Sequence, residues 1–374
     1  MMDLFRSSGT LRRMAVRYSK PVGALGGVAS LVAGIYSDQV RSGVVHVLRL
    51  MGTWGTAPVV AVVFAGVGWS LQELRWKLKS RRSLIRRQSF EIQVDDFEND
   101  LPRDQSVIGR ELHYLEHVTE SNKLVVLLHG LGLDANDFRP YMQVAKEHTV
   151  GITLFGFNES ETSDARYRPI GLTTHAELVN GAINNLHRQY PGKKLVLVGF
   201  SLGADMLLRL GELWQDHPSR KPQVSAILLL DPNINHSTML LSGGLARMNP
   251  LEPLTELKRI AQIPTNLVEF QNFSEYLHKV SVKNPAQIRR HAQDVWDYWE
   301  PDGKYDLFMD RIKRLAGFNI NVRVICSVHY EQHFNDVTTL ARGHGLRQIF
   351  SLCRVDHFAL FREPFLIDQM KLLV

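Results

Sequence analysis

Short apolar runs recur along residues 83–374 and alternate with longer amphipathic stretches. The strand-like runs are FEIQVDD, RELHYLEHV, KLVVLLHG, VGITLF, KLVLVGF, VSAILLLD, NVRVICSV and RQIFSLC. Helix-like stretches such as HAELVNGAINNLHRQY and ADMLLRLGELWQ separate most of them. Continuous apolar strands that alternate with helices are typical of a parallel sheet covered on both faces. The pattern therefore predicts an α/β domain with a mostly parallel sheet.

The longest interruption of this alternation lies between about residues 233 and 317. The helix-like pieces LEPLTELKRIA and PAQIRRHAQDVWDYW stand there before the next apolar strand. Helices inserted at this point are additional to the alternating pattern, so we expect them to form a helical cap on the domain.

Residues 50–72 contain no charged side chain, and their apolar run WGTAPVVAVVFAGVGWSL is long enough to cross a bilayer. Trp54 and Trp69 lie near its ends, where aromatic rings prefer the membrane interface. The basic sequence RWKLKSRRSLIRR follows directly and should stay on the cytoplasmic side. We therefore predict a transmembrane helix here, with the domain that follows on the cytoplasmic side.

An earlier uncharged run, residues 21–37, is shorter, rich in glycine and preceded by several arginines. If both runs cross, their basic flanks face the same side, so we expect a hairpin of two spans within an anchor over residues 1–82. The alternatives for the first run are an interfacial helix, a core helix or part of an organellar transit peptide. A cleavable secretory signal fits poorly, because arginines rather than small residues follow the strongest apolar run.

The distribution of charge favours a membrane partner, and the two cysteines are too few for a disulfide framework. The chain has 374 residues and a formal net charge of +6, and its basic excess is concentrated near the N-terminus. That placement favours a lipid bilayer over nucleic acid as the partner. Cys326 and Cys353 are the two cysteines, and both lie in apolar strand-like runs, so we expect buried thiols rather than a disulfide or a metal pair.

The stretch KLVLVGFSLGADM places Ser201 between Gly199 and Gly203, where a buried strand is predicted to become a helix. A sharp strand-to-helix turn can expose a nucleophile in a cleft, and its tightness demands small residues two positions away on either side. The following helix points its free backbone N–H groups and its positive dipole end at a developing anion. These features make Ser201 a candidate nucleophile.

Four motifs in this order resemble those of the α/β-hydrolase fold superfamily: HGLG, GFSLG, LLLDP and VDHFALF, which follow the third, fifth, sixth and last predicted strands. The resemblance covers roughly residues 90–374. It implies a parallel sheet with a Ser, acid and His triad, and it does not identify a substrate. It also implies that the backbone N–H groups of Leu131 and Leu202 bind the oxyanion. His129 is expected to be structural.

His357 is the candidate general base, because it follows the last strand in a short loop and precedes the final helix. The resemblance leaves three positions for the acid that orients its imidazole. Glu331 lies just beyond the seventh strand, the region where most members carry the acid, and is our first choice. Asp231 ends the sixth strand, where some lipases carry it, and Asp336 is the third candidate.

The sequence thus predicts a membrane-anchored serine hydrolase that cleaves an ester through an acyl-Ser201 intermediate, without a metal or an organic cofactor. The apolar segment STMLLSGGLARMNPLEPL could supply a lid for acyl chains, which favours a lipid or another hydrophobic acyl ester. A thioesterase or an acyltransferase would use the same chemistry. A membrane-bound scaffold that keeps the fold without catalysis is the alternative of another class.

Overall fold

The computed structural model describes residues 85–93, 107–158, 168–239, 241–247 and 267–373. All of them belong to one compact unit, Leu84–Val374. The predicted spans and the rest of the predicted anchor lie outside the described residues. Within the described part of the chain, the helices are too short or too polar to cross a bilayer.

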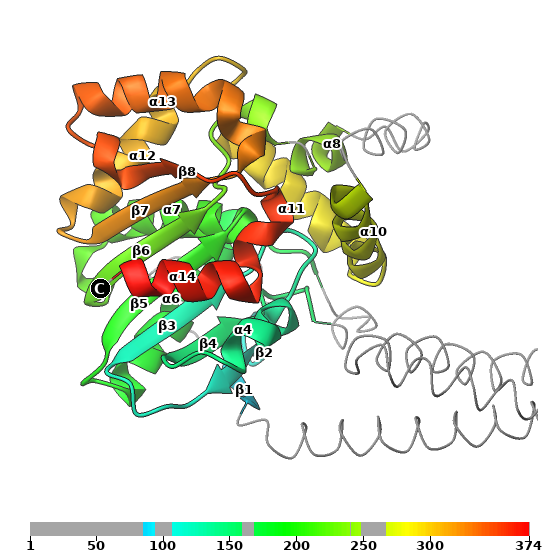
Figure 1. Cartoon of the computed structure of the whole chain (residues 1–374). Coiled ribbons are helices and arrows are strands. Elements are labelled where there is room, and N and C mark those ends of the chain that lie inside the picture. Colours follow the sequence, from blue (N-terminus) through cyan, green and yellow to red (C-terminus); the bar gives the residue numbers. More distant parts are fainter. Residues whose placement is uncertain (1–84, 94–106, 159–167, 240, 248–266, 374) are drawn as a thin grey trace, which may run out of the picture. The chain divides into compact units, whose positions relative to one another are not determined.

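An eight-stranded sheet forms the centre of this unit, in the order β1-β2-β4-β3-β5-β6-β7-β8 (Figure 1). Strand β2 is antiparallel to both of its neighbours, and the remaining neighbours are parallel. The predicted mostly parallel sheet is therefore confirmed. The strands are β1 (Ile85–Glu91), β2 (Glu111–His117), β3 (Lys123–Leu128), β4 (His148–Ile152), β5 (Lys194–Phe200), β6 (Val224–Leu230), β7 (Asn321–Cys326) and β8 (Phe350–Leu352).

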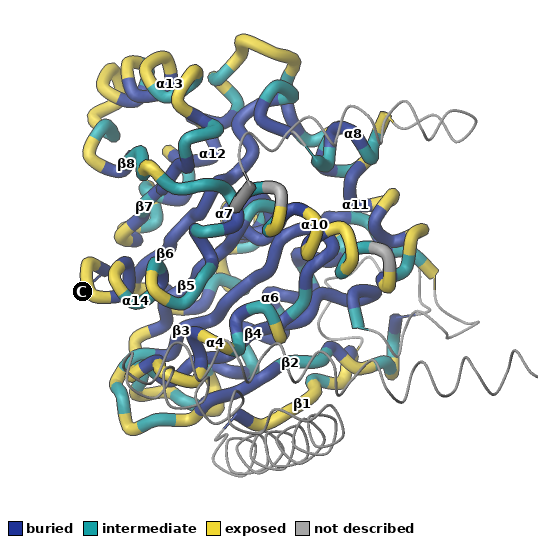
Figure 2. The backbone as a smooth tube through the Cα atoms, turned by 45° about the vertical axis from the view of Figure 1, so that its right-hand side comes forward, coloured by how far each residue is buried: buried dark blue, intermediate teal, exposed yellow. Residues whose placement is uncertain are grey.

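Strand β1 begins five residues earlier than the apolar run FEIQVDD predicts, since its seven residues are IRRQSFE. Most of its side chains are exposed, whereas the central strands are buried (Figure 2). It pairs with β2 along its whole length, from Ile85 opposite His117 to Glu91 opposite Glu111. Because an edge strand is stabilised by backbone pairing and tolerates charged side chains, hydrophobic periodicity alone could not locate it.

Alternate residues of the strands enter two different cores, because successive side chains of a strand point to opposite faces of the sheet. Val125 and Leu127 of β3 face one core, and Leu124 and Val126 face the other. The first core is closed by α4 (Arg139–Met142), η8 (His357–Phe361) and α14 (Glu363–Leu372). The second is closed by α6 (Leu172–Gln189), α7 (Leu202–Asp216), α12 (Asp306–Gly317) and α13 (Glu331–Gly343). Figure 1 shows α4 and α14 in front of the sheet.

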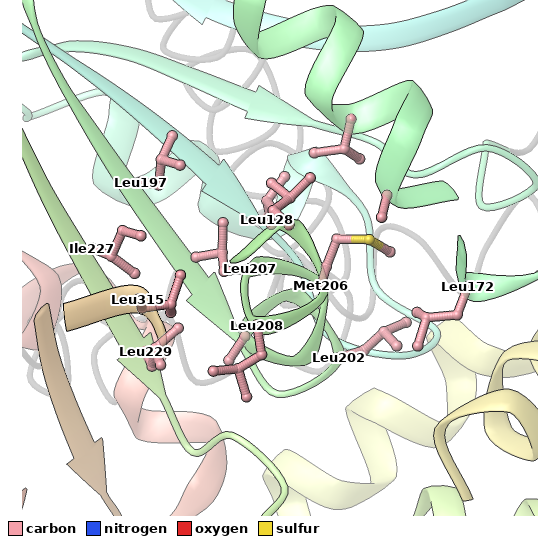
Figure 3. Close-up of a cluster of buried hydrophobic side chains, with 14 of the residues drawn as sticks. Leu128, Leu172, Leu197, Leu202, Met206, Leu207, Leu208, Ile227, Leu229 and Leu315 are labelled. Atoms are coloured by element: carbon pink, nitrogen blue, oxygen red, sulfur yellow. The ribbon is translucent and has the colours of Figure 1, made fainter. Parts of the chain in front are cut away.

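Helix α7 is buried along most of its length. Figure 3 shows Leu207 and Leu208 of α7 beside Leu197 and Leu229 of the sheet and Leu315 of α12. All five side chains are fully buried. Truncation of such a leucine to alanine typically costs about 2 to 5 kcal/mol of stability. This packing gives the residue directly before α7, Ser201, a rigid foundation.

The segment between β6 and β7 contains several described helices in addition to α12. Helix α8 packs on α11, where a side chain on Gly243 would meet the ring of Trp296. The helices of this segment and the remaining short helices are η3 (Ala135–Phe138), η4 (Pro218–Arg220), η5 (His236–Thr238), α8 (Ser242–Arg247), α10 (Leu267–Ser281), α11 (Pro285–Tyr298), η6 (Val328–Tyr330) and η7 (Arg347–Ile349).

Polar contacts connect α11 with α6 and with the loop that precedes α6. The side chain of Gln287 exchanges two hydrogen bonds of 2.9 Å with the backbone of Ile170, and Asp294 accepts from the backbone N–H of Leu172 at 2.8 Å. His291 meets His175 of α6 with 2.7 Å between Nε2 and Nδ1. These polar contacts add to the apolar packing of Ile288, Ala292 and Val295 of α11 in the second core.

Candidate active site

Ser201 stands on a sharp turn between β5 and α7, with φ 51° and ψ −117°. A positive φ is uncommon for a residue with a side chain, and such strain is concentrated at functional sites. A Cβ atom on Gly199 would overlap the backbone of Gly203, and one on Gly203 would overlap the carbonyl group of Leu128. The two glycines are therefore required by the close approach of β3, β5 and α7, as the spacing around Ser201 predicts.

Two candidate oxyanion donors lie next to this turn. Leu202 is the first residue of α7, where backbone N–H groups have no intrahelical acceptor. Leu131 lies in the loop after β3 and lines the same pocket as Ser201. Among the residues that the structure describes, no acceptor is paired with the backbone N–H of Leu131 or Leu202. Both N–H groups are therefore available to a ligand oxygen.

His357 pairs with Asp231, with 2.7 Å between Nδ1 of the imidazole and Oδ2 of the carboxylate. The other carboxylate oxygen accepts from the backbone N–H of Ser327 at 2.6 Å. Asp231 is completely buried, whereas a fifth of the His357 side chain is exposed. Because an ionised carboxylate only accepts, Nδ1 carries the proton of a neutral imidazole and Nε2 is left as an acceptor.

The structure brings Asp231, and not our first choice Glu331, into hydrogen-bond contact with His357. The turn η6 follows β7, so the chain has already passed the strand end when Glu331 begins α13. Glu331 and Asp336 both lie exposed on that helix. Asp231 instead sits directly at the end of β6 in a left-handed backbone conformation, with φ 44°.

Ser201 and His357 line one pocket with a cavity volume of about 60 Å³. Most of its wall is apolar and is contributed by Leu131, Leu133, Phe200, Leu241, Phe273, Tyr276 and Phe358. Its polar lining consists of Asn233, Thr238, Ser242, His329 and Tyr330. Leu241 and Ser242 belong to the segment in which an apolar lid was expected, and residues 248–254 of that segment lie outside the described residues. An apolar cavity beside a serine and a histidine suits the acyl part of an ester.

His129 supports the loop that carries Leu131. Its ring is completely buried, its Nδ1 donates to the carbonyl of Gly130 at 2.8 Å, and its Nε2 accepts from the backbone N–H of Leu154 at 3.0 Å. Burial lowers the pKa of the imidazole and keeps it neutral, as both hydrogen bonds require. These contacts agree with the structural role expected for His129.

A buried carboxylate that the sequence analysis did not single out lies one turn after the serine. Asp205 accepts hydrogen bonds from the backbone N–H of Asn233 at 3.2 Å and from its side chain at 2.5 Å. Burial raises the pKa of Asp205 to about 7. An acidic residue within the apolar helix sequence LGADMLLRL is the signal that could have drawn attention to it. Its effect is to fix Asn233 at the pocket wall.

The remaining histidines and the cysteines form no metal centre in the part of the chain that the structure describes. His333 meets the hydroxyl of Tyr305 at 3.0 Å, and His344 is exposed. Both cysteines are free thiols. Cys326 is buried, which raises the pKa of its thiol, and Cys353 is half-buried. Neither resembles a reactive thiolate.

Comparison with known proteins gives the fold. No protein-family model and no curated protein matches the sequence. The structure of an AqdC variant that binds and ring-cleaves the Pseudomonas quinolone signal matches with 15% identity over 77% of this chain and 99% of that chain, at a TM-score of 0.50. A bacterial membrane phospholipase A matches with 16% identity over 90% and 97%, at 0.47. An esterase from Thermogutta terrifontis matches with 16% identity over 76% and 96%, at 0.47.

At these identities the likeness concerns the fold alone. Together with the strand order and the helices on both faces of the sheet, it fits the α/β-hydrolase fold. What the site does must therefore be argued from its own residues.

Proposed function

We propose that this protein is a serine hydrolase that cleaves a carboxylic ester through an acyl-Ser201 intermediate. The observation that carries the proposal is the hydrogen bond between His357 and the buried Asp231, in a pocket that Ser201 enters from a strained strand-to-helix turn. A nucleophile, a base and a group that orients the base are the three parts that nucleophilic acyl transfer requires.

In the acylation step, Nε2 of His357 takes the proton of the Ser201 hydroxyl while Oγ attacks the ester carbonyl carbon. The carbonyl oxygen becomes an oxyanion, which accepts hydrogen bonds from the backbone N–H groups of Leu131 and Leu202. The tetrahedral intermediate collapses, and the alcohol leaves with the proton that His357 held. Asp231 stabilises the imidazolium that exists between these two proton transfers.

In the deacylation step, His357 takes a proton from water, and the hydroxide that forms attacks the acyl carbon. The second intermediate collapses to the carboxylic acid and Ser201 regains its proton. No metal or organic cofactor takes part in this scheme. With a thiol as the leaving group, the same site would act as a thioesterase. With a second alcohol in place of water as the acyl acceptor, it would act as an acyltransferase.

The apolar lining supports a hydrophobic acyl ester as substrate, with a lipid ester as the leading class. We further propose that residues 1–82 hold the enzyme in a membrane as an integral anchor, with the hydrolase domain on the cytoplasmic side. The support for the anchor is the uncharged run of residues 50–72 and the basic cluster after it. An anchor of this kind would keep the pocket near lipid substrates.

A fluorophosphonate probe tests the mechanism, because it modifies serine nucleophiles that an adjacent base activates. We expect labelling of the purified full-length protein, with the adduct mapped to the peptide that contains Ser201. Ser201→Ala should abolish the labelling, and Ser242→Ala is the matched control because Ser242 lines the same pocket. Folded wild-type protein that does not react would favour a non-catalytic scaffold. Competition by a panel of lipid and short-chain esters would rank the substrate classes.

A further inference from the structure

Tyr276 belongs to α10, in the segment between β6 and β7, and it lines the candidate pocket. Its side chain is almost completely buried, with 5% of the residue exposed, and it lines the cavity with Ser201 and His357. The ring packs against Phe358, with 5.2 Å between ring centroids. Phe358 directly follows His357, so the tyrosine ring packs on the chain neighbour of the proposed general base.

The Tyr276 hydroxyl faces the loop that supplies a proposed oxyanion donor. A methyl group on Gly132, the residue after Leu131, would lie 3.5 Å from this hydroxyl. The same methyl group would collide with Val280, which lies one turn further along α10. This side of α10 is therefore packed closely on the loop, and the hydroxyl lies at that contact.

Within the described residues, the Tyr276 hydroxyl has no hydrogen-bond partner. Two other hydroxyls of the pocket are already engaged, because Thr238 donates to the carbonyl of Asn235 at 2.9 Å and Tyr330 donates to the carbonyl of Asp231 at 3.3 Å. A hydroxyl in the pocket wall without a protein partner is free to donate to a ligand atom in the cavity. Burial raises the pKa of Tyr276, so the hydroxyl keeps its proton at neutral pH and can donate.

Ion pairs attach α10 and the turn after it to the same loop. Lys279 pairs with Asp137, and Lys283 pairs with Asp134. Asp134 and Asp137 form the capping box of η3, which begins three residues after Gly132. These ion pairs attach the segment that carries Tyr276 to the loop that carries Leu131.

We propose that the Tyr276 hydroxyl donates a hydrogen bond to the ester oxygen that becomes the oxyanion, as a third donor beside the backbone N–H groups of Leu131 and Leu202. This inference rests on the proposed serine hydrolase function. It makes the inserted segment a part of the catalytic site, because one of its side chains touches the reacting atoms.

The test compares Tyr276→Phe with wild type in the hydrolysis of p-nitrophenyl butyrate, after fluorophosphonate labelling has established that Ser201 is active. We expect kcat to fall on the order of tenfold or more with little change in KM, because the hydrogen bond strengthens as negative charge develops. Thermal stability should not fall, since phenylalanine keeps the ring packing. Tyr141→Phe is the matched control, because Tyr141 is buried in α4 outside the pocket.

A second variant separates a hydrogen-bonding role from a packing role. Replacement of Tyr276 by 3,5-difluorotyrosine keeps the ring and the hydroxyl but lowers the pKa of the phenol. The donor would then be lost at lower pH, so the alkaline limb of the kcat profile should move to lower pH than in wild type.

An unchanged kcat in Tyr276→Phe, or a change confined to KM, would overturn the role of Tyr276 while the proposed function stands. An unshifted alkaline limb in the fluorinated protein would overturn it as well. Wild-type protein that neither labels nor hydrolyses any ester would overturn the proposed function and this inference together.

Discussion

The ends of β5 and β6 differ from helices α10 and α11 in the forces that hold them. Strands β5 and β6 run through the middle of the sheet, with buried leucines and valines on both faces. Helices α10 and α11 also bury apolar side chains such as Phe273 and Ile288, but lysine–aspartate pairs, an amide and a histidine pair make a large part of their attachment polar. Nonpolar packing responds little to pH or salt, whereas these polar contacts respond to both. The helices around the candidate site should therefore loosen with changes of pH or salt before the central strands do.

The largest effect should come from a change at the sheet that leaves the fold intact. Asp231→Asn is expected to lower kcat by a factor on the order of 10⁴, because the amide no longer holds the imidazole in the productive tautomer. Steady-state kinetics with a chromogenic ester measure kcat, and a melting curve checks that the fold is intact. Glu331→Gln is the control and should leave kcat unchanged. A large loss of kcat in Glu331→Gln with none in Asp231→Asn would instead favour Glu331 as the acid.

An intermediate effect should come from the attachment of α10. Lys283→Met removes the partner of Asp134, and the Lys283 side chain is 3% exposed. The loss of one member of a buried ion pair typically destabilises by about 3 to 5 kcal/mol. Hydrogen exchange should show this loss first in α10. Lys313→Met, which breaks an exposed pair with Asp310, should cost about 1 kcal/mol or less. An equal loss of unfolding free energy in Lys283→Met and Lys313→Met would contradict a stabilising role of the buried pair.

The smallest of these effects should be acid loosening at the histidine pair. His175 and His291 are completely buried, and burial lowers the pKa of His291 to about 3. In the unfolded chain the histidine side chain has its ordinary pKa of about 6.5 and takes up a proton there, whereas the buried side chain stays neutral. The free energy of unfolding therefore falls as the pH drops from about 6.5 towards 3. The slope is at most about 1.4 kcal/mol per pH unit for each histidine, which gives roughly 2 kcal/mol for His291 at about pH 5.

Urea unfolding at a series of pH values measures this slope. His291→Gln removes one titrating group and keeps a hydrogen-bonding side chain near His175, so its slope should be smaller. His344→Gln alters an exposed histidine and should leave the slope unchanged. Stability that stays constant between about pH 7 and pH 5 would contradict a buried, neutral histidine pair.

The sheet and the position of Ser201 could be predicted because local patterns determine them. Apolar strands buried on both faces repeat along the chain, and the glycines around Ser201 respond to a steric demand within a few residues of it. The edge strand β1 was misplaced, because its charged sequence IRRQSFE shows no apolar periodicity.

Which carboxylate meets His357, and which residue of the inserted helices reaches the pocket, depend on contacts that sequence spacing does not encode. Asp231 and Glu331 each follow a strand, and two neighbouring strands deliver their carboxyl ends to the same edge of the sheet. The left-handed turn at Asp231 and its hydrogen bond from Ser327 accompany the contact of its carboxylate with His357, and neither feature is visible in the sequence. Tyr276 reaches the pocket from α10 and matches no sequence motif. Its place in the same pocket as Ser201 and His357 is therefore seen only in the structure.

Trapping of the acyl-enzyme tests the central claim most directly. Wild-type protein mixed with excess p-nitrophenyl butyrate and quenched in acid within the first turnovers should gain the mass of one butyryl group. Peptide mapping should place that group on Ser201, and Ser201→Ala should show no adduct. Rapid ester turnover with no covalent adduct on Ser201, or with the adduct on another residue, would contradict the account.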